Sequence, residues 1–157
     1  MTKKKSSLRI VALGAALVVA AAGVTTSFAC TAIPEDIGLE SGRLRPCPDS
    51  PNCVVSEGDA ANVDPFPYTG DGNEALTRLA DLMVANENAR IETLEPPYAH
   101  VVFTTSLMRF RDDVELRVDE ANGVIQVRSA SRVGHSDLGA NRDRVERIRA
   151  LWAEAGN

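Results

Sequence analysis

The sequence predicts an α+β fold: a single domain with about four antiparallel strands and two helices packed on one face of the sheet, in the order α-β-β-β-β-α. Three observations lead to this prediction. Apolar residues recur at helical spacing in two places, over residues 73–86 and 139–154. Between them, short segments rich in β-branched residues are separated by turn residues. The simplest arrangement of these elements lays both helices on the apolar face of a curved sheet.

The first 29 residues have the pattern of an export signal peptide. An uncharged apolar run over residues 10–24 follows the basic residues Lys3, Lys4, Lys5 and Arg9. Small residues at Ser27 and Ala29 then suit cleavage by a signal peptidase. The sequence therefore predicts that the chain leaves the cytoplasm.

Cys30 follows the predicted cleavage point and resembles the lipid-bearing cysteine of a bacterial lipobox, although Ser27 stands where an aliphatic residue is usual. A lipoprotein acylated at Cys30 is one interpretation. Cleavage without lipid, giving a periplasmic or extracellular protein, is a second. The third is an uncleaved anchor, because residues 10–29 carry no charge and have the length that spans a bilayer. We expect membrane attachment through acyl-Cys30 or the N-terminal segment, or else secretion.

The predicted mature chain is acidic and has the size of one domain. Of the 17 basic residues, four lie in residues 1–29, so the mature chain keeps 13, all arginine, against 22 acidic residues, a net charge of −9. This balance argues against a nucleic-acid partner. We interpret residues 30–42 as a tether and residues 43–157 as a single domain, long enough to bury a core.

Cys47 and Cys53 form an even pair once Cys30 is assigned to the lipid. In an exported protein such a pair favours a disulfide, which pins the turn-rich loop between the two cysteines. Two alternatives stay open: the thiolates hold a metal ion together with His100 or His135, or one of them is a catalytic nucleophile. We predict the disulfide, and neither a metal nor a cofactor.

Periodic structure begins after residues 31–72, whose Pro, Gly, Asp, Asn and Ser content predicts the tether and then a surface loop. The first helix is predicted over residues 73–86, where one stripe is aliphatic. Two strands follow, over residues 89–94 and 98–106, joined by the turn Glu95-Pro-Pro97.

A hairpin comes next, with strands around residues 114–118 and 124–130 joined by the turn Glu120-Ala-Asn-Gly123. A four-residue turn sets the register of the two strands. The predicted pairs are Val118 with Ile125, Leu116 with Val127, and Glu115 with Arg128. The first two pairs are expected on the inner face and the third on the outer face.

A final helix is predicted over residues 139–154. Its buried stripe consists of Val145, Ile148, Leu151 and Trp152, and charged neighbours keep its other side in water. Ser136 and Asp137, just before this helix, are the natural candidates for its N-cap.

Asp112, Asp113 and Glu115 form an acidic cluster at the start of the third predicted strand. Paired carboxylates can act as acid and base or hold Ca²⁺ or Mg²⁺. In the predicted register, however, Asp113 and Glu115 lie beside Arg128 and diagonal to Arg132. A cross-strand ladder of ion pairs therefore explains the cluster, and we favour this structural interpretation.

The segment between the last strand and the last helix contains the residue types of a hydrolase triad: Ser129, Ser131, His135 and Asp137. A triad needs a base within reach of the nucleophile and an acid behind the base, which residues on one short turn rarely provide. We favour helix capping and assign no catalytic residue. The enzymatic alternative uses Ser131 as nucleophile and His135 with Asp137, Asp112 or Asp113.

Backbone N–H groups at the start of the last helix, around residues 138–141, lie close in sequence to several arginines. Such donors together with guanidinium groups favour a carboxylate, phosphate or sulfate group. The candidate ligand-binding residues are Arg128, Arg132, His135, Asp137, Asn141 and Arg142. The alternative is that Asp137 satisfies the backbone donors itself.

Three motifs stand in order along the chain: Cys47-Pro-Asp-Ser-Pro-Asn-Cys53, Phe110-Arg-Asp-Asp-Val-Glu115 and Arg128-Ser-Ala-Ser-Arg-Val-Gly-His-Ser-Asp-Leu-Gly-Ala-Asn-Arg142. Together, over roughly Arg43 to Trp152, they resemble the bacterial and plastid domain of unknown function 1499 family. The resemblance implies an exported or membrane-attached protein of uncharacterised activity, and it carries over no catalytic residue. His135 stands where members often have Tyr or Arg, which argues against a mechanism that needs this imidazole.

Three functions fit these observations. The first, which we favour, is a noncatalytic envelope module that binds a small anionic ligand or an envelope protein through the Cys47–Cys53 loop, Arg132, His135 and Arg142. The second is the hydrolase or metal-assisted enzyme, which requires His135, Ser131 and Asp113 to converge on one cleft. The third is a purely structural envelope lipoprotein.

Overall fold

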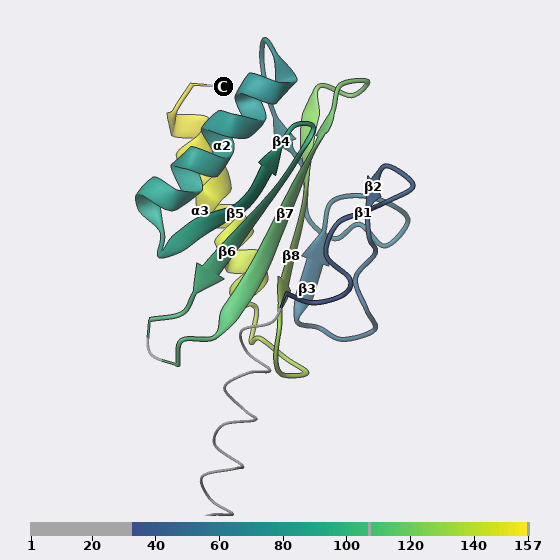
Figure 1. Cartoon of the computed structure of the whole chain (residues 1–157), viewed down its shortest axis with the longest axis vertical. Helices are drawn as coiled ribbons and strands as arrows, with labels where there is room; N and C mark the ends of the chain where they lie inside the picture. The colour runs from purple at the N-terminus through teal and green to yellow at the C-terminus, as the bar shows by residue number, and fades with distance from the viewer. Residues whose placement is uncertain (1–32, 107, 157) are drawn as a thin grey trace, which may run out of the picture. The chain divides into compact units, whose positions relative to one another are not determined.

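The computed structural model describes residues 33–106 and 108–156, and its elements are drawn in Figure 1. The chain divides into two units, residues 1–33 and 34–157, and every helix and strand of the described residues belongs to the second. The predicted signal peptide and Cys30 lie outside the described residues. Within the described part, no helix has the length and apolar character needed to cross a membrane.

A six-stranded sheet forms the centre of the second unit. Its strands are hydrogen-bonded in the order β3-β8-β7-β6-β5, β4 also pairs with β8, and all pairings are antiparallel. Two further strands, β1 and β2, pair with each other. The bounds are β1 Leu39–Glu40, β2 Arg43–Leu44, β3 Cys53–Val55, β4 Phe66–Pro67, β5 Ala89–Glu95, β6 Tyr98–Thr104, β7 Arg111–Asp119 and β8 Val124–Ser131.

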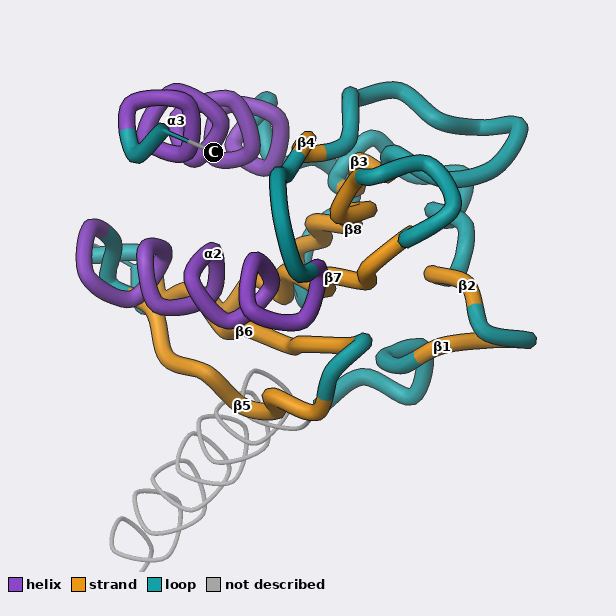
Figure 2. Tube along the Cα trace, turned by 90° about the horizontal axis from the view of Figure 1, so that it is seen from above, coloured by secondary structure: helices purple, strands orange, loops and turns teal. Residues whose placement is uncertain are grey.

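The sheet is the middle layer of three. Helices α2 (Gly72–Asn86) and α3 (Ala140–Glu154) cover one of its faces (Figure 2). The other face is covered by the N-terminal segment, residues 34–46, which contains β1 and β2. This segment is held to the sheet by polar contacts such as the 2.7 Å hydrogen bond from the Gly38 N–H to Glu115.

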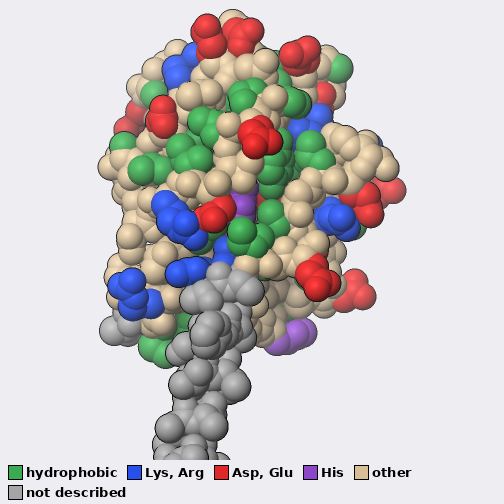
Figure 3. All heavy atoms as spheres, in the orientation of Figure 1, with side chains coloured by type: hydrophobic (Ala, Val, Ile, Leu, Met, Phe, Trp, Pro, Cys, Tyr) green, Lys and Arg blue, Asp and Glu red, His purple; other side chains and the backbone are tan. Residues whose placement is uncertain are grey.

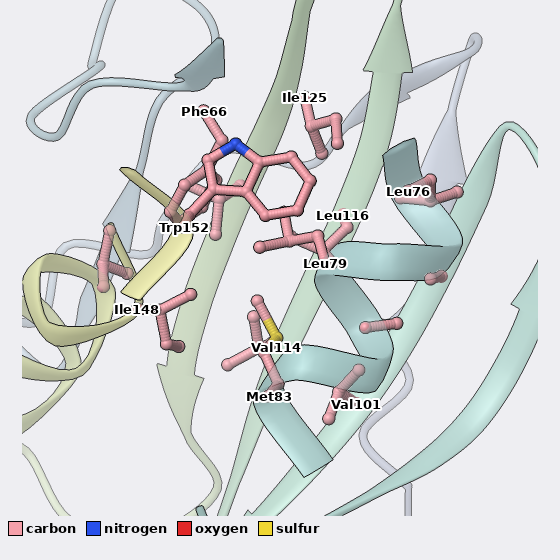
Figure 4. Packing of buried hydrophobic residues seen from close by; sticks show 14 of the residues in the cluster. Phe66, Leu76, Leu79, Met83, Val101, Val114, Leu116, Ile125, Ile148 and Trp152 are labelled. Carbon is pink, nitrogen blue, oxygen red and sulfur yellow. The ribbon is translucent and has the colours of Figure 1, made fainter. Parts of the chain in front are cut away.

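The hydrophobic core lies between the helices and the sheet (Figure 4). Val101, Leu116 and Ile125 on the strands point toward Leu79 of α2 and Ile148 of α3, and all five are fully buried. Removing this aliphatic surface from water is the main stabilisation of the fold. It also explains why one face of each long strand is apolar.

The α+β class, the antiparallel pairing and the two helices on one face are confirmed, but the predicted number and order of strands are wrong. The sheet also contains β3 and β4, which precede α2 and fall within residues predicted to be loop. These strands have three and two residues, too few to show a period of two. They are strands because β8 offers them a partner, and this long-range effect leaves no local pattern.

The predicted hairpin register is confirmed at all three pairs, Val118 with Ile125, Leu116 with Val127 and Glu115 with Arg128. The first two pairs face the core as expected. The outer face, however, is not in water, since the side chains of Glu115 and Arg128 are 0% and 2% exposed. The N-terminal segment buries them, and the prediction of a free tether did not include this cover.

Cys47 and Cys53 form the predicted disulfide, with Cα atoms 5.6 Å apart. Cys53 is the first residue of β3 and pairs with Ala130 of β8. The bridge therefore ties the loop before β3 to the edge of the sheet. Because both sulfurs are bonded, neither is available as a metal ligand or a nucleophile.

Candidate functional site

A layer of charged side chains covers the face of the sheet opposite the helices. His100, Glu115 and Arg128 stand side by side on β6, β7 and β8, since His100 pairs with Glu115 and Glu115 with Arg128. These residues are 2%, 0% and 2% exposed. Along each strand, the side chains that do not face the apolar core thus form a second buried layer. We call this layer the polar layer; it consists of His100, Asp113, Glu115, Arg128 and Arg132.

Arg128 joins the polar layer to the N-terminal segment. Its Nη1 donates to Glu115 Oε2 at 2.8 Å, and its Nη2 donates to Asp36 Oδ2 at 2.5 Å. The side chain of Asp36 is 52% exposed. Among the atoms of the described chain, the Nε of Arg128 is buried and has no hydrogen-bond partner. Arg128 therefore has one buried partner, one exposed partner and one unsatisfied donor.

Glu115 is fixed by further hydrogen bonds. Besides Arg128, its carboxylate accepts bonds from the Gly38 N–H at 2.7 Å and from the Tyr98 hydroxyl at 2.8 Å. Burial and then the charge of Glu115 raise the pKa of Tyr98, so the phenol keeps its proton and acts as a donor. Both oxygens of this fully buried carboxylate therefore have hydrogen-bond partners, as a buried polar group requires.

Asp113 holds the second group of the polar layer. His100 Nε2 lies 2.7 Å from its Oδ1, and Arg132 donates from Nε to Oδ2 at 2.8 Å and from Nη2 to Oδ1 at 2.7 Å. Burial opposes ionisation of Asp113, but the hydrogen bonds from His100 and Arg132 outweigh it and hold its pKa below the ordinary value of 3.8. The hydrogen bond to Asp113 in turn raises the pKa of Arg132. The bidentate geometry makes this a strong, oriented pair.

A cavity of about 130 Å³ opens beside the polar layer, between the N-terminal segment, the disulfide loop and the end of β8. Its charged and polar lining includes Asp36, Ser50, Asn52, Asp113, Arg128 and Arg132. This volume holds several water molecules but is smaller than the pockets that bind drug-sized ligands. The cavity therefore fits a small polar group.

Of the six predicted ligand-binding residues, Arg128 and Arg132 meet at this cavity, beside the disulfide loop. The other four lie elsewhere. His135 is exposed in the loop after β8, and Arg142 donates to the carbonyl oxygen of Asn62 at 2.8 Å. Asp137 and Asn141 belong to a separate network at the start of α3.

Asn141 is the centre of that network. Its side-chain oxygen accepts hydrogen bonds from the Ser129 hydroxyl and from Arg144, both at 2.6 Å. Its amide nitrogen donates to the Asn52 carbonyl at 3.0 Å and to Ser131 Oγ at 2.9 Å. One fully buried side chain thus links α3 to β8 and to the disulfide loop.

The acidic cluster does not act as one group. Asp112 faces the helices and pairs with Arg144, whereas Asp113 and Glu115 face the N-terminal segment. Each carboxylate has a guanidinium partner, as the interpretation by ion pairs requires. In the described ranges, no three His, Cys, Asp or Glu side chains are grouped so that they could hold a metal ion.

Asp137 satisfies the backbone donors at the start of α3. Its carboxylate accepts hydrogen bonds from the Gly139 N–H at 2.9 Å and the Asn141 N–H at 2.8 Å. The N-cap position itself is Gly139, not Ser136 or Asp137 as predicted, and Gly139 adopts the left-handed conformation. Burial opposes ionisation of Asp137, but the backbone donors and then the Asn141 amide hold its pKa below 3.8. The backbone donors that favoured an anion site are therefore already engaged.

The hydrolase candidates do not converge. Ser131 accepts a hydrogen bond from Asn141 of α3, whereas Asp113 lies on the opposite face of the sheet beside His100. His135 is exposed. Ser131 and Asp113 both line the cavity beside Arg128, but neither His135 nor His100 lines it. Ser131, His135 and Asp113 thus lack the geometry of a triad.

Sequence reasoning missed the roles of His100 and Asp36. Tyr98 and His100 alternate with apolar neighbours on β6, and this period of two was the one available sign that they share a face. Asp36 lies in the predicted tether, and its pairing with Arg128 across 92 residues has no local sequence pattern.

These features define a small α+β domain whose sheet is packed against helices on one side and against an ion-paired polar layer on the other. Residues 43–151 match the model of the family described as "Protein of unknown function (DUF1499)", and the chain belongs to this family. The match confirms the resemblance of the three motifs and covers nearly the span expected from them. None of the curated proteins compared with the chain matches it.

Acid is expected to weaken the fold through Asp113. A carboxyl whose pKa is lower in the folded than in the unfolded chain stabilises the fold above the unfolded value, here 3.8, and this contribution is lost as the pH falls through the folded pKa. The free energy of unfolding in urea should therefore fall progressively below about pH 5. Asp113→Asn, which cannot titrate, should show a shallower dependence, and an unchanged slope would contradict this assignment.

Proposed function

We propose that the protein is a noncatalytic module of the cell envelope that binds a small anionic group in the cavity beside Arg128. It is attached to the membrane through acyl-Cys30 or the apolar residues 10–29. One observation carries the proposal: Arg128, a buried arginine that lines the cavity, has a buried Nε without a hydrogen-bond partner in the described chain, while its Nη2 is occupied by the exposed Asp36. A ligand carboxylate or phosphate has the chemistry to take both positions.

The chemistry of Arg128 supports an exchange of anions. A buried N–H without a partner costs on the order of 1–3 kcal/mol, which an incoming oxygen atom would recover. Asp36 already shows that a carboxylate fits against Nη2, at 2.5 Å. Because Asp36 is half exposed and belongs to the N-terminal segment, it can leave at lower cost than the fully buried Glu115.

The cavity limits what can bind. Its volume of about 130 Å³ suits one carboxylate, phosphate or sulfate group rather than a whole cofactor. Asp113 and Arg132 also line the cavity and neutralise each other. The expected ligand is therefore the acidic end of a larger molecule.

Two further observations support the envelope assignment and the lack of catalysis. The Cys47–Cys53 disulfide is of the kind that persists in oxidising compartments, in agreement with the export pattern of residues 1–29. Ser131 and Asp113 both line this cavity, but His135, the base that the hydrolase would need, is exposed in the loop after β8 and does not line it. Binding therefore accounts for the geometry better than hydrolysis does.

Removing the internal carboxylate is expected to strengthen anion binding. With inorganic phosphate or acetate as the probe and the full chain in detergent micelles, Asp36→Asn should bind about tenfold more tightly than the wild type, the equivalent of one charge-assisted hydrogen bond. Titration calorimetry and the ligand-induced rise in the thermal midpoint would both report the change.

Glu35→Gln is the matched control, because it removes the same charge from an exposed neighbouring position. If both variants gained the same affinity for phosphate or acetate, the change in net charge alone would explain the result. If neither the wild type nor Asp36→Asn binds phosphate or acetate, the cavity is not an anion site.

A further inference from the structure

One end of the domain carries most of the apolar side chains that are left in water. Five large hydrophobic residues of the described chain are exposed, and three of them, Met108, Phe110 and Leu138, lie in two loops. The exposed fractions of these three are 63%, 39% and 96%. Scattered single residues of this kind are ordinary, whereas several at one end indicate an interaction surface.

The two loops leave the same end of the sheet. Met108 and Phe110 belong to the connection from β6 to β7, and Leu138 belongs to the connection from β8 to α3. The start of β7 and the end of β8 are neighbours, because the Arg132 N–H donates to the Arg111 carbonyl at 3.2 Å. Both loops lie at the lower end of Figure 1. We call this end, residues 105–110 without 107 together with residues 133–139, the loop end.

The N-terminal segment begins at the loop end too. Pro34 and Arg132 line the same cavity, so the chain enters the second unit beside the end of β8. Cys30 lies four residues earlier, and an extended chain of that length spans at most about 14 Å. An acyl group on Cys30 or an apolar span ending at Ala29 would each keep Pro34, and with it the neighbouring end of β8, close to a bilayer surface.

The charge of the β6–β7 loop suits an anionic bilayer. From Pro96 to Arg111 the sequence contains no acidic residue, although the chain as a whole carries a net charge of −5. Arg109 is exposed in this loop. In Figure 3 basic side chains gather at the lower left of the face shown, whereas acidic ones predominate at its upper end. Exposed arginine beside apolar side chains is the composition of surfaces that bind anionic lipid.

Building on the membrane attachment proposed above, we propose that the loop end docks on an anionic lipid bilayer, with Leu138, Met108 and Phe110 in the headgroup region and Arg109 against lipid phosphates. The docked domain then stands with the β7–β8 turn pointing away from the membrane. The cavity beside Arg128 opens near the bilayer, because its lining includes Pro34, at the start of the N-terminal segment, and Arg132, which directly precedes the loop end in sequence.

Indole quenching by brominated lipid tests this orientation. The full chain is reconstituted into vesicles of equimolar phosphatidylcholine and phosphatidylglycerol, with bromine on the acyl chains of the phosphatidylcholine. Leu138→Trp is the probe variant. Ala121→Trp is the matched control, because Ala121 is exposed in the β7–β8 turn at the opposite end. Trp152, 3% exposed, contributes the same background to both.

Most of the fluorescence added by Leu138→Trp should be lost in brominated vesicles, while that added by Ala121→Trp should be retained. Met108→Trp should behave like Leu138→Trp and covers the case in which the latter does not fold. Adding Arg109→Glu should reduce the quenching of Leu138→Trp in these vesicles but not in vesicles of phosphatidylcholine alone.

Flotation of the vesicles distinguishes a failure of the docking from a failure of the membrane attachment. If the protein floats with the vesicles and neither probe variant is quenched, or all variants are quenched equally, the docking is wrong and the attachment stands. If the protein does not float, both the attachment and the docking are wrong. Neither result bears on anion binding by Arg128, which is measured in micelles.

Discussion

Arg128→Met is expected to lower the free energy of unfolding by about 3–5 kcal/mol, because it leaves a buried carboxylate without its cation. Glu115 is 0% exposed, and the hydrogen bonds from Gly38 and Tyr98 cannot supply a compensating charge. Asp36 loses its partner as well, so the N-terminal segment should loosen. Urea unfolding followed by circular dichroism measures the loss.

Arg147→Met is the control for this substitution. It removes an arginine from the exposed pair with Glu87, whose two side chains are 55% and 23% exposed, and should cost less than about 1 kcal/mol. Combining Arg128→Met with Glu115→Gln removes the charge as well as its partner and should recover a large part of the loss. The polar layer would have no role in stability if Arg128→Met cost no more than Arg147→Met.

Asn141→Ala is expected to be the second most damaging substitution, with a loss of about 2–4 kcal/mol. It removes the amide oxygen and the amide nitrogen together. Three buried groups then each lose a hydrogen bond: the hydroxyl of Ser129, the guanidinium of Arg144 and the carbonyl of Asn52. Buried groups that lose their partners carry the full cost of their desolvation. The start of α3 should also separate from β8, which amide hydrogen exchange would detect.

Asn86→Ala provides the comparison on the other helix. Its amide makes one exposed hydrogen bond to the Leu82 carbonyl at 2.9 Å, and its removal should change stability by no more than about 0.5 kcal/mol. Equal urea midpoints for the two variants would mean that the Asn141 network does not hold α3 in place.

The sequence predicts the long elements and the hairpin register because these depend on local periods. Four strands and two helices are long enough to show a period of two or of 3.6 residues, and the turn at Glu120–Gly123 sets the pairing of β7 with β8. β3 and β4 are too short for a period, and their pairing with β8 is decided by tertiary contacts. Composition alone therefore assigned them to a loop.

The polar layer could be predicted only in part. Alternation on β7 and β8 places Asp113, Glu115, Arg128 and Arg132 on one face, and the ion-pair interpretation follows from that. Alternation cannot tell whether a polar face meets water or another segment. That Asp36 and residues around it bury this face depends on how a turn-rich segment folds back over the sheet, for which the sequence has no repeating pattern.

The position of the disulfide determines how the domain would respond to a mechanical load on its N-terminal end. A force applied at Pro34 would act first on the contact of Asp36 with Arg128 and on the two-residue pairing of β1 with β2. These contacts can break one after another, so that the N-terminal segment separates from the sheet stepwise. At Cys47 the load passes through the covalent bridge to Cys53 and from there into β3, whose backbone is hydrogen-bonded to β8. The separation would stop at this point. Tension would then expose the charged face of the sheet to water, while the helices continue to cover the aliphatic core.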